Sequence, residues 1–531
     1  MAEGPTFVEK IGVVIRSPSI YYYIFRPFRG IEIDVGTFVA VEVDGARVLS
    51  KVTAVRHRNT ATDPRLIAHF DDVETVDTVK ETLGIEDALY YTEAKAVVLG
   101  ARRGGRIYRP QKPVKPLSYV YKASKSELEE FFAPRSDGVY ITVGTVKGTD
   151  IPVRIDAERL VTHHCAILAS TGAGKSWLAG VIVERLSLLD IPIIIVDPHG
   201  EYSAMSIPAT DKGKQVSEKV RIYVVGKVDV KHVDEAFAQR YGHPRVYTRV
   251  GINPRSLPPR TLEKILADLY GLTDAQRRIL EEGWQQATSY GERQPLTSVE
   301  ELVKEVLDGG RHVAPPGYAG EMALRGLEGR LKSLFYNSPI FITMYGETYQ
   351  GEPLKLIDPQ AYATSPNIHV FDLSGLDSLD QQIFLAVLLD QLYRLATRRR
   401  IATTFTVVEE AHIFAPSSAQ SVSRSYLARI AREGRKFGLG LCLITQRPAK
   451  LDQDVASQAM TQIFKRMINP NDLKYVANVA EQLEDPRLLK TLNEDDAVVV
   501  GVSVPAPLLI TVGERWTNHG GITPRLRKEV T

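Results

Sequence analysis

The sequence predicts an α/β fold with a parallel central sheet, preceded by a small β-barrel and interrupted by an all-helical insertion. From about residue 160, apolar runs such as CAILA (165–169) and IPIIIVD (191–197) alternate with helical patterns, as expected for parallel strands covered on both faces. Residues 10–115 contain short runs rich in Val, Ile and aromatics, with the hairpin signal Asp44-Gly45 between two of them. Residues 258–338 contain few strand signals.

The bulk composition is that of an ordinary globular protein. The 531 residues suffice for two to four domains, and 66 Lys and Arg against 64 Asp and Glu give a net charge of +2. That balance neither demands nor excludes nucleic acid. Both cysteines, Cys165 and Cys442, lie in apolar runs, which suits a reducing compartment. No run approaches the ~18 apolar residues of a membrane span. We therefore expect a cytoplasmic protein with no membrane contact.

These strand-like and helix-like sequence patterns divide the chain into segments. We expect an N-terminal barrel or sandwich over residues 1–115, and a linker with strands leading into the core over 116–158. The core would occupy 159–257 and 341–504, on either side of a helical insertion at 258–340. Residues 505–531 read as an irregular C-terminal tail.

The string STGAGKS follows the strand at 165–169 and precedes a helical pattern from Lys175 to Leu189. Glycines in such a loop let successive N–H groups turn towards phosphate oxygens, and the helix adds its positive end. Lys175 can reach the β and γ phosphates, and the Ser176 hydroxyl can hold Mg²⁺. Ala169 replaces the first glycine of the usual pattern, which is the least demanding change. The string therefore predicts a nucleotide phosphate loop, and the expected contacts come from Ser170, Thr171, Gly172, Ala173, Gly174, Lys175, Ser176 and Trp177.

Two adjacent carboxylates, Glu409 and Glu410, end the apolar strand TFTVV. Such a pair is costly at the end of a core strand unless a cation lies nearby. Ligands of parallel sheets bind at the carboxyl ends of the strands, so Mg²⁺ on a nucleoside triphosphate is the expected cation. We expect Glu409 to orient the metal and Glu410 to act as the general base for water.

Further candidates follow other strands. Asp197 and Glu201 in DPHGEY would lie beside the phosphate loop if the two strands are neighbours, although the string is also good turn chemistry. Gln446 in TQRP could sense the γ-phosphate and the attacking water, or simply cap its strand. His412 and the pair His163-His164 have no metal-ligand spacing.

Three arginines, Arg429, Arg432 and Arg435, recur every three residues in YLARIAREGRKFG. By default they form one solvated face of a helix. In a ring-shaped assembly, one of them could instead reach a neighbour's γ-phosphate as an arginine finger.

Taken in order, the strings STGAGKS, DPHGEY, VVEEAHIF, RIAREGRKFGLGL and TQRP resemble the HerA subgroup of the FtsK–HerA motor ATPases. The N-terminal region is similar to the small barrel that these proteins share with rotary ATP synthases. The resemblance covers roughly residues 10–205 and 365–505. It implies a RecA-like core that uses ATP and Mg²⁺ and a homohexamer around double-stranded DNA. It also implies a helicase or translocase that works with a NurA-type nuclease in end resection during double-strand-break repair by homologous recombination.

The resemblance also implies site roles. Lys175 and Ser176 bind phosphate and Mg²⁺, Glu409 and Glu410 serve metal and water, Gln446 senses the phosphate, and Arg435 matches the family's finger. Where the family often has Arg-His before the phosphate-loop strand, this chain has His163-His164. If that arginine meets a neighbour's nucleotide, His163 does so here more weakly, or Arg159 replaces it. The tail after Val504 could brace the neighbouring subunit.

Two other readings remain open. Related ring motors move protein or conjugative DNA through membranes, although such coupling proteins usually carry spans that are missing here. A protein of another class would bind ATP only to assemble partners, with little turnover. Two adjacent acids and a sensor Gln favour hydrolysis over that scaffold.

Overall fold

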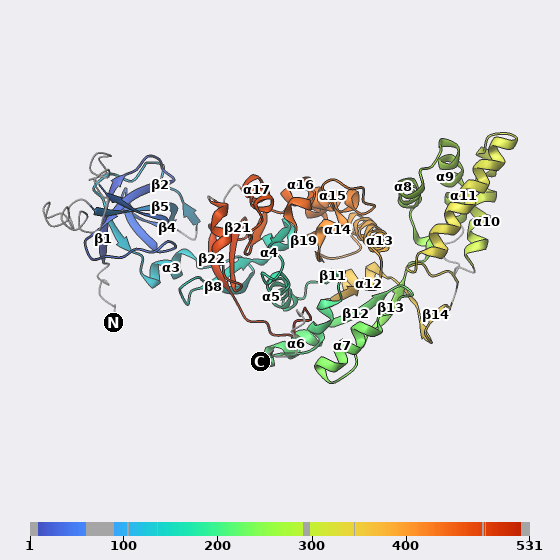
Figure 1. The fold of residues 1–531 in the computed structure, drawn as a ribbon, viewed down its shortest axis with the longest axis horizontal. Coiled ribbons are helices and arrows are strands. Elements are labelled where there is room, and N and C mark those ends of the chain that lie inside the picture. Colours follow the sequence, from blue (N-terminus) through green and yellow to red (C-terminus); the bar gives the residue numbers. More distant parts are fainter. Residues whose placement is uncertain are drawn as a thin grey trace, which may run out of the picture. The chain divides into compact units, whose positions relative to one another are not determined.

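The computed structural model describes residues 9–59, 90–103, 106–134, 136–289, 298–344, 346–480, 483 and 485–521. The chain divides into two compact units. The first contains Met1–Gly138 with Val146–Arg154, and the second contains Val139–Thr145 with Ile155–Thr531 (Figure 1).

The described residues of the first unit form a closed barrel. Its strand order is β2-β1-β7-β3-β4-β5, and β2 pairs again with β5 to close it, while β6 adds to the far edge of β5. The strands are β1 (Lys10–Arg16), β2 (Tyr22–Pro27), β3 (Phe38–Val43), β4 (Ala46–Asn59), β5 (Tyr90–Arg103), β6 (Arg106–Tyr108) and β7 (Tyr119–Lys122). The expected barrel is confirmed.

Local sequence explains the barrel. Asp44 and Gly45 both have positive φ, 49° and 77°, as the tight turn between β3 and β4 requires. Alternating residues of the strands, among them Tyr23, Phe25 and Val39, are fully buried inside it. The barrel extends past the boundary expected at residue 115, because β7 pairs with β1 and β3. The helix α3 (Lys125–Phe131) then begins at a capping box made by Ser124 and Glu127.

The second unit is built on one long mixed sheet, with the order β16-β13-β12-β17-β11-β18-β19-β10-β20-β21-β22-β8 among its described strands. Neighbours from β16 to β20 pair in parallel, and β20, β21 and β22 pair antiparallel. The strands are β8 (Tyr140–Val146), β10 (Cys165–Leu168), β11 (Ile193–Asp197), β12 (Val220–Val225), β13 (Thr248–Gly251), β16 (Lys355–Leu356), β17 (Ile368–Asp372), β18 (Thr404–Val408), β19 (Leu439–Thr445), β20 (Thr461–Phe464), β21 (Asp496–Gly501) and β22 (Leu508–Val512). The residues of β9 (Pro152–Asp156) are divided between the two units.

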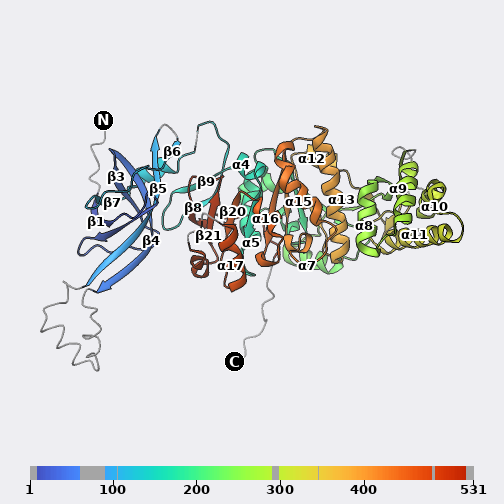
Figure 2. The ribbon, with the colours of Figure 1, turned by 90° about the horizontal axis from the view of Figure 1, so that it is seen from above.

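Helices cover this sheet and connect its parallel strands (Figure 2). They are α4 (Ala157–Thr162), α5 (Lys175–Ser187), α6 (Asp211–Ser217), α7 (Lys231–Tyr241), α12 (Pro359–Thr364), α13 (Ser378–Thr397), α14 (Ala411–Phe414), α15 (Arg424–Glu433), α16 (Gln453–Ser457) and α17 (Pro470–Val479). Short 3₁₀ helices are η1 (Glu201–Ser206), η2 (Pro254–Ser256), η3 (Arg311–Val313), η4 (Gly434–Phe437), η5 (Pro448–Lys450) and η6 (Pro486–Thr491). The central strands are buried along their whole length, as the continuous apolar runs predict.

The chain between β13 and the next strands forms helices, as expected. They are α8 (Pro259–Tyr270), α9 (Asp274–Ser289), α10 (Val299–Gly310) and α11 (Tyr318–Asn337), followed by the short strands β14 (Thr348–Tyr349) and β15 (Glu352–Pro353). Trp284 of α9 is fully buried, and its indole N–H donates to the carbonyl of Leu257. In this group, α8 is the helix that packs against α13 (Figure 2).

Two expectations differ from the structure. The strands β10 and β11 are not neighbours, because β18 and β19 lie between them. The tail after Val504 is not irregular throughout, since β22 pairs antiparallel with β21. Within the part of the chain that the structure describes, no helix combines the length and the apolar character that a bilayer crossing needs.

Candidate functional site: a phosphate loop facing two carboxylates

Residues 170–176, called the phosphate loop below, comprise the turn after β10 and the first two residues of α5. Gly172 and Gly174 have φ of 72° and 77°, a left-handed conformation that side chains disfavour. Gly174 is also the N-cap residue of α5 and has no side-chain cap, which leaves the first N–H groups of the helix for a ligand. The expected strand–loop–helix is confirmed.

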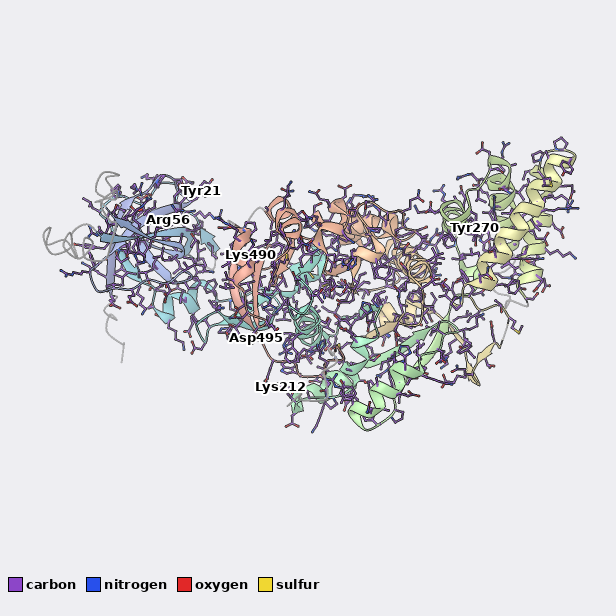
Figure 3. All side chains as sticks on the ribbon, in the orientation of Figure 1. Tyr21, Arg56, Lys212, Tyr270, Lys490 and Asp495 are labelled. Atoms are coloured by element: carbon purple, nitrogen blue, oxygen red, sulfur yellow. The ribbon has the colours of Figure 1, made fainter. Side chains whose placement is uncertain are left out.

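A buried lysine supports the loop from the side. A Cβ atom on Gly174 would lie 3.2 Å from Cε of Lys465, which follows β20. The Lys465 ammonium donates to the carbonyls of Glu494 and Asp496. Burial lowers the pKa of Lys465 to about 8, although the charge of Asp495, which is labelled in Figure 3, opposes that shift. A side chain at position 174 would therefore crowd Lys465 and the Glu494 carbonyl, in addition to the cost of its backbone angle.

The strand order brings the acids and the glutamine to this loop. Proceeding from β10, the next strands are β19, which ends before Gln446, and β18, which ends before Glu409 and Glu410. Lys175 Nζ lies 3.7 Å from Glu410 Oε1. The Thr171 hydroxyl donates to Gln446 Oε1 at 2.6 Å. The structure thus places Lys175, Glu410 and Gln446 together at the carboxyl ends of the parallel strands, called this edge of the sheet below.

The two carboxylates differ sharply in their surroundings. Burial raises the pKa of Glu409 to about 7, although Lys175 and a hydrogen bond from Tyr202 oppose that shift. The Tyr202 hydroxyl donates to Glu409 Oε2 at 2.6 Å. For Glu410, burial alone would raise the pKa, but His412 and Lys175 outweigh it and the pKa lies below its usual value. Glu410 is therefore the carboxylate that stays ionised near neutral pH.

The backbone at Glu410 is strained. Its φ is 49°, which a residue with a long side chain rarely adopts, and it is the N-cap of α14. Strain of this kind costs about 1–3 kcal/mol and concentrates at functional sites. It turns Glu410 away from the path of β18, so that two adjacent residues can have different partners.

Asp197 does not lie beside the phosphate loop, because its strand β11 is on the far side of β18. Its carboxylate accepts the backbone N–H groups of His199, Gly200 and Tyr202 and so stabilises the turn. Burial and the nearby Asp372 nevertheless raise its pKa to about 8, outweighing these donors. The contribution of this turn to the site is Tyr202, which reaches Glu409. Glu201 lies next to it at the start of η1.

His163 and Arg435 lie at the opposite side of the sheet, at the amino ends of the parallel strands. His163 precedes β10 and Arg435 precedes β19, whereas the phosphate loop follows β10. The pKa of His163 is lowered by burial and then by the charges of Arg435 and Arg159, which indicates that these residues are close. His163 and Arg435 therefore lie at the ends of β10 and β19 away from the phosphate loop of their own chain.

The three arginines do not share one helix face. The helix α15 ends at Glu433, and Arg435 lies on η4. Arg429 is not free in solvent, because it forms an ion pair with Asp390 at 2.7 Å. Arg432 and Arg435 are exposed.

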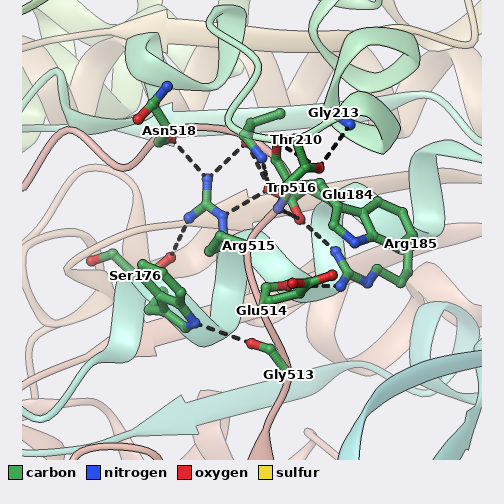
Figure 4. A network of polar contacts seen from close by, with 12 residues as sticks. Ser176, Glu184, Arg185, Thr210, Gly213, Gly513, Glu514, Arg515, Trp516 and Asn518 are labelled. Atoms are coloured by element: carbon green, nitrogen blue, oxygen red, sulfur yellow. Dashed lines mark hydrogen bonds and ion pairs between the residues drawn. The ribbon is translucent and has the colours of Figure 1, made fainter.

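The described part of the C-terminal tail folds back on its own chain. Residues 513–521, called the strap below, lie along α5 (Figure 4). The fully buried carboxylate of Glu184 accepts from Arg515 Nε at 2.8 Å, from Thr517 Oγ1 at 2.6 Å and from the backbone N–H groups of Trp516 and Thr517. A Cβ on Gly180 of α5 would lie 1.9 Å from the Arg515 guanidinium, so Gly180 provides the room for it. The tail beyond residue 521 is outside the described residues.

The strap also reaches the start of α5. Arg515 donates to the carbonyl of Ser176 at 3.2 Å, and Trp177 Nε1 donates to the carbonyl of Gly513 at 3.2 Å. The ring of His519 meets the ring of Trp177 edge to face. Burial, and then the charges of Arg515, Arg240 and Lys175, lower the pKa of His519 to about 4. The strap is thus a neighbour of the phosphate loop in the same subunit.

The donor set suits Mg²⁺ bound together with phosphate. Among the described residues, no group of three or more His, Cys, Asp or Glu side chains could hold a metal ion by itself. Mg²⁺ at nucleotide sites needs only one or two protein oxygens besides the phosphates and water. Glu409 is 3% exposed, and Glu410 Oε2 is buried without a hydrogen-bond partner, so both favour a nearby cation. Ser176 and Glu409 are the residues that would hold the ion.

Sequence reasoning missed three residues at this edge. Tyr202 and His412 belong to the motifs DPHGEY and VVEEAHIF. The spacing of His412 excludes a metal-ligand role but does not predict its contact with Glu410. A polar side chain within two residues of a predicted general base was the available signal. Arg515 has no local signal, because its partner Glu184 is 331 positions away.

Comparisons with known proteins agree with the fold. The family model described as "Helicase HerA, central domain" matches residues 141–392, and the HAS barrel domain matches residues 11–104. The chain is 26% identical over 549 residues to the DNA double-strand break repair helicase HerA of Pyrococcus furiosus, covering 95% of this chain and 92% of that protein. It is 27% identical over 511 residues to the protein of the same name from Sulfurisphaera tokodaii, covering 93% and 91%.

A solved structure supports the fold. VirB4 of Thermoanaerobacter pseudethanolicus aligns with a TM-score of 0.51 at 17% identity, over 71% of this chain and 97% of that one. The RecA-like fold expected from the sequence is confirmed. Both family models match in their expected order, and the chain is similar to HerA helicases over more than nine-tenths of its length.

Proposed function

We propose that the protein is an ATP-hydrolysing motor that moves double-stranded DNA through a ring of six subunits. In this proposal it acts in the cytoplasm as a helicase or translocase with a NurA-type nuclease, in DNA end resection for double-strand-break repair. The observation that carries the proposal is the contact of Lys175 with Glu410 at the edge of the sheet where the phosphate loop and Gln446 meet.

Each residue at this edge has a role in the proposed hydrolysis. The N–H groups of the phosphate loop and the Lys175 ammonium bind the β and γ phosphates of ATP. Ser176 and Glu409 hold Mg²⁺, which offsets the negative charge that the phosphates carry during transfer. Tyr202 fixes one oxygen of Glu409 at 2.6 Å and thereby sets the direction of the carboxylate.

Glu410 serves as the general base. Its carboxylate accepts a proton from water, the water oxygen forms a bond to the γ-phosphorus, and the bond from that phosphorus to the bridging oxygen breaks. The bridging oxygen leaves with the electron pair as part of ADP. A depressed pKa keeps Glu410 in the ionised form that this step requires. Gln446, whose amide already contacts the phosphate loop, holds the water and reports the loss of the γ-phosphate.

The position of Arg435 supports a ring. It is exposed and precedes the amino end of β19, whereas its own phosphate loop follows the carboxyl end of β10. An arginine in that position acts on a nucleotide only if a neighbouring subunit presents one. The tail at 505–531 is expected to brace that neighbour, but its residues 513–521 are fixed to their own subunit.

The DNA substrate is proposed from the names of the relatives, and the nuclease partner is proposed from the motif resemblance alone. The relatives from Pyrococcus furiosus and Sulfurisphaera tokodaii are named DNA double-strand break repair helicases, and the alignments span more than nine-tenths of this chain. We extend that activity to this chain as a proposal.

The test is the rate of ATP hydrolysis with and without linear duplex DNA. We expect stimulation by duplex DNA of any sequence, weakening as salt rises, because a motor grips phosphates rather than base edges. The Lys175→Ala variant controls for contaminating ATPases and should lose turnover. Indifference to DNA would favour an ATP-gated scaffold, and a response only to a protein substrate would favour a polypeptide motor.

A further inference from the structure

His412 contacts both strand ends that carry the proposed chemistry. It belongs to α14, which begins directly after Glu410. Its Nδ1 atom lies 3.2 Å from Glu410 Oε2 and 3.0 Å from Thr445 Oγ1. Thr445 is the last residue of β19, and Gln446 follows it. One ring nitrogen therefore joins the end of β18 to the end of β19.

We infer that His412 is a positioning residue that holds the Glu410 carboxylate for proton transfer and ties it to the strand of Gln446. This inference rests on the proposed ATP hydrolysis. The partner of His412 is the carboxylate and not the nucleotide, so its loss should slow the chemical step without weakening ATP binding.

Glu410 needs such a holder. Glu410 is 4% exposed, its backbone is in the left-handed region, and its Oε2 atom is buried without a hydrogen-bond partner. The Nδ1 atom already bonds to Thr445, and the last torsion of a histidine has a broad energy minimum. A small turn of the ring would align an Nδ1–H with Oε2 while keeping it near Thr445. In that tautomer one N–H group faces both acceptors.

The two oxygens of Glu410 have separate partners. Oε1 faces the Lys175 ammonium at 3.7 Å, and Oε2 faces His412. Lysine in this position binds the β and γ phosphates, which draws it away from Oε1. Oε1 then becomes available to take the proton from water, while His412 keeps hold of Oε2. The same division assigns Oε1 as the reacting atom and His412 as the fixed support.

The contacts around His412 form a closed chain that passes through the phosphate loop. Thr445, the residue before Gln446, forms a hydrogen bond with His412, and Gln446 accepts from Thr171. The Gln446 backbone also contributes to the depressed pKa of Glu410. Movement of Gln446 when the γ-phosphate leaves would therefore reach Glu410 through His412.

The choice of side chain at 412 gives a specific test. Asparagine places an amide nitrogen close to the position of Nδ1, and glutamine places it close to that of Nε2. We expect His412→Asn to retain most of kcat, and His412→Gln and His412→Ala to lose about 10- to 100-fold, the usual loss when an orienting partner is removed. KM for ATP and the equilibrium binding of a fluorescent ATP analogue should not change in any of the three. His232→Ala, which removes an exposed histidine of α7, is the matched control and should leave kcat unchanged.

A double-variant cycle separates positioning from a structural role. If His412 acts through Glu410, then adding His412→Ala to Glu410→Gln should cause little further loss of kcat. Additive losses, a parallel fall in ATP binding and melting temperature, or equal behaviour of the Asn and Gln variants would overturn the inference. Wild-type protein that does not hydrolyse ATP would instead refute the proposed function itself. An active wild type with a fully active His412→Ala would refute only the role of His412.

Discussion

Glu409 and Glu410 are neighbours in the chain and opposites in their electrostatics. One is fully buried against Tyr202 with a pKa of about 7, and the other faces Lys175 and His412 with a depressed pKa. We expect Glu410→Gln to bind ATP and Mg²⁺ normally and to hydrolyse ATP at least about 100-fold more slowly, because the shape remains while the base is lost. Single-turnover phosphate release together with ATP-analogue binding measures both. If Glu409→Gln binds normally and stalls while Glu410→Gln stays active, the two roles are reversed.

The buried His164 side chain should make the stability of the fold sensitive to acid. It is 3% exposed, its Nδ1 accepts the Leu441 N–H at 3.1 Å, and burial lowers its pKa to about 4. The unfolded chain protonates this histidine below about pH 6.5, whereas the folded protein resists until about pH 4. Its contribution to stability is therefore complete above pH 6.5 and is lost as the pH falls towards 4.

The variant His164→Asn should reduce this acid sensitivity. Asparagine can accept the Leu441 N–H and tolerates the φ of 60° at this position. Between pH 7 and pH 5, we expect the free energy of unfolding of the variant to fall by about 1–2 kcal/mol less than that of the wild type. Urea unfolding at both pH values measures this. His232→Asn, at an exposed site, should follow the wild type, and an unchanged slope in His164→Asn would contradict the assignment.

At the scale of elements, the strap is held to α5 by the buried Glu184 carboxylate, which forms ion pairs with both Arg515 and Arg185. Arg515 and Glu184 are 3% and 0% exposed in their side chains. Arg515→Ala removes one cation from the buried Glu184 carboxylate, which keeps Arg185 as its ion-pair partner, so we expect a loss of about 1–3 kcal/mol. We expect a clear fall in the denaturant midpoint. Lys212→Ala is the matched control, because exposed Lys212 lies over the same Trp516 ring that Arg185 covers and should change stability by less than about 0.5 kcal/mol (Figure 3). Equal effects of the two variants would show that the ion pair does not hold the strap.

The elements also show how far the sequence predicts this protein. The phosphate loop, the helix after it and the two acids at a strand end were predictable, because each depends on residues adjacent in the chain. The order β10-β19-β18-β11 was not, since β10 pairs with β19 and β11 pairs with β18 across more than 200 residues. That order removes Asp197 from the phosphate loop and brings Gln446 to it. The strand β22 was missed because its run PLLITV lies among Pro and Gly, and only its pairing with β21 fixes it.

At the scale of the whole molecule, Arg435 separates a ring machine from a self-contained ATPase. The arginine is exposed and lies across the sheet from its own phosphate loop, so a role in hydrolysis requires a second subunit. A finger in trans contributes about 10³ to 10⁵ in rate, or roughly 4 to 7 kcal/mol. An exposed arginine without such a role changes stability by about 0.5 kcal/mol or less. We therefore expect Arg435→Ala to fold, to bind ATP through its own phosphate loop and to lose hydrolysis.

Mixing subunits provides the sharper measurement. Arg435→Ala subunits keep an intact phosphate loop, and Lys175→Ala subunits keep an intact Arg435, so mixed rings should regain some active interfaces although each variant alone is inactive. Restored phosphate release would place the arginine across an interface. If subunit exchange is demonstrated by labelling and no activity returns, Arg435 does not act in trans. Arg432→Ala is the control, because Arg432 is also exposed but belongs to α15 rather than to η4. Should Arg432→Ala be the inactive variant and Arg435→Ala the mild one, the finger lies on α15 and the ring mechanism remains.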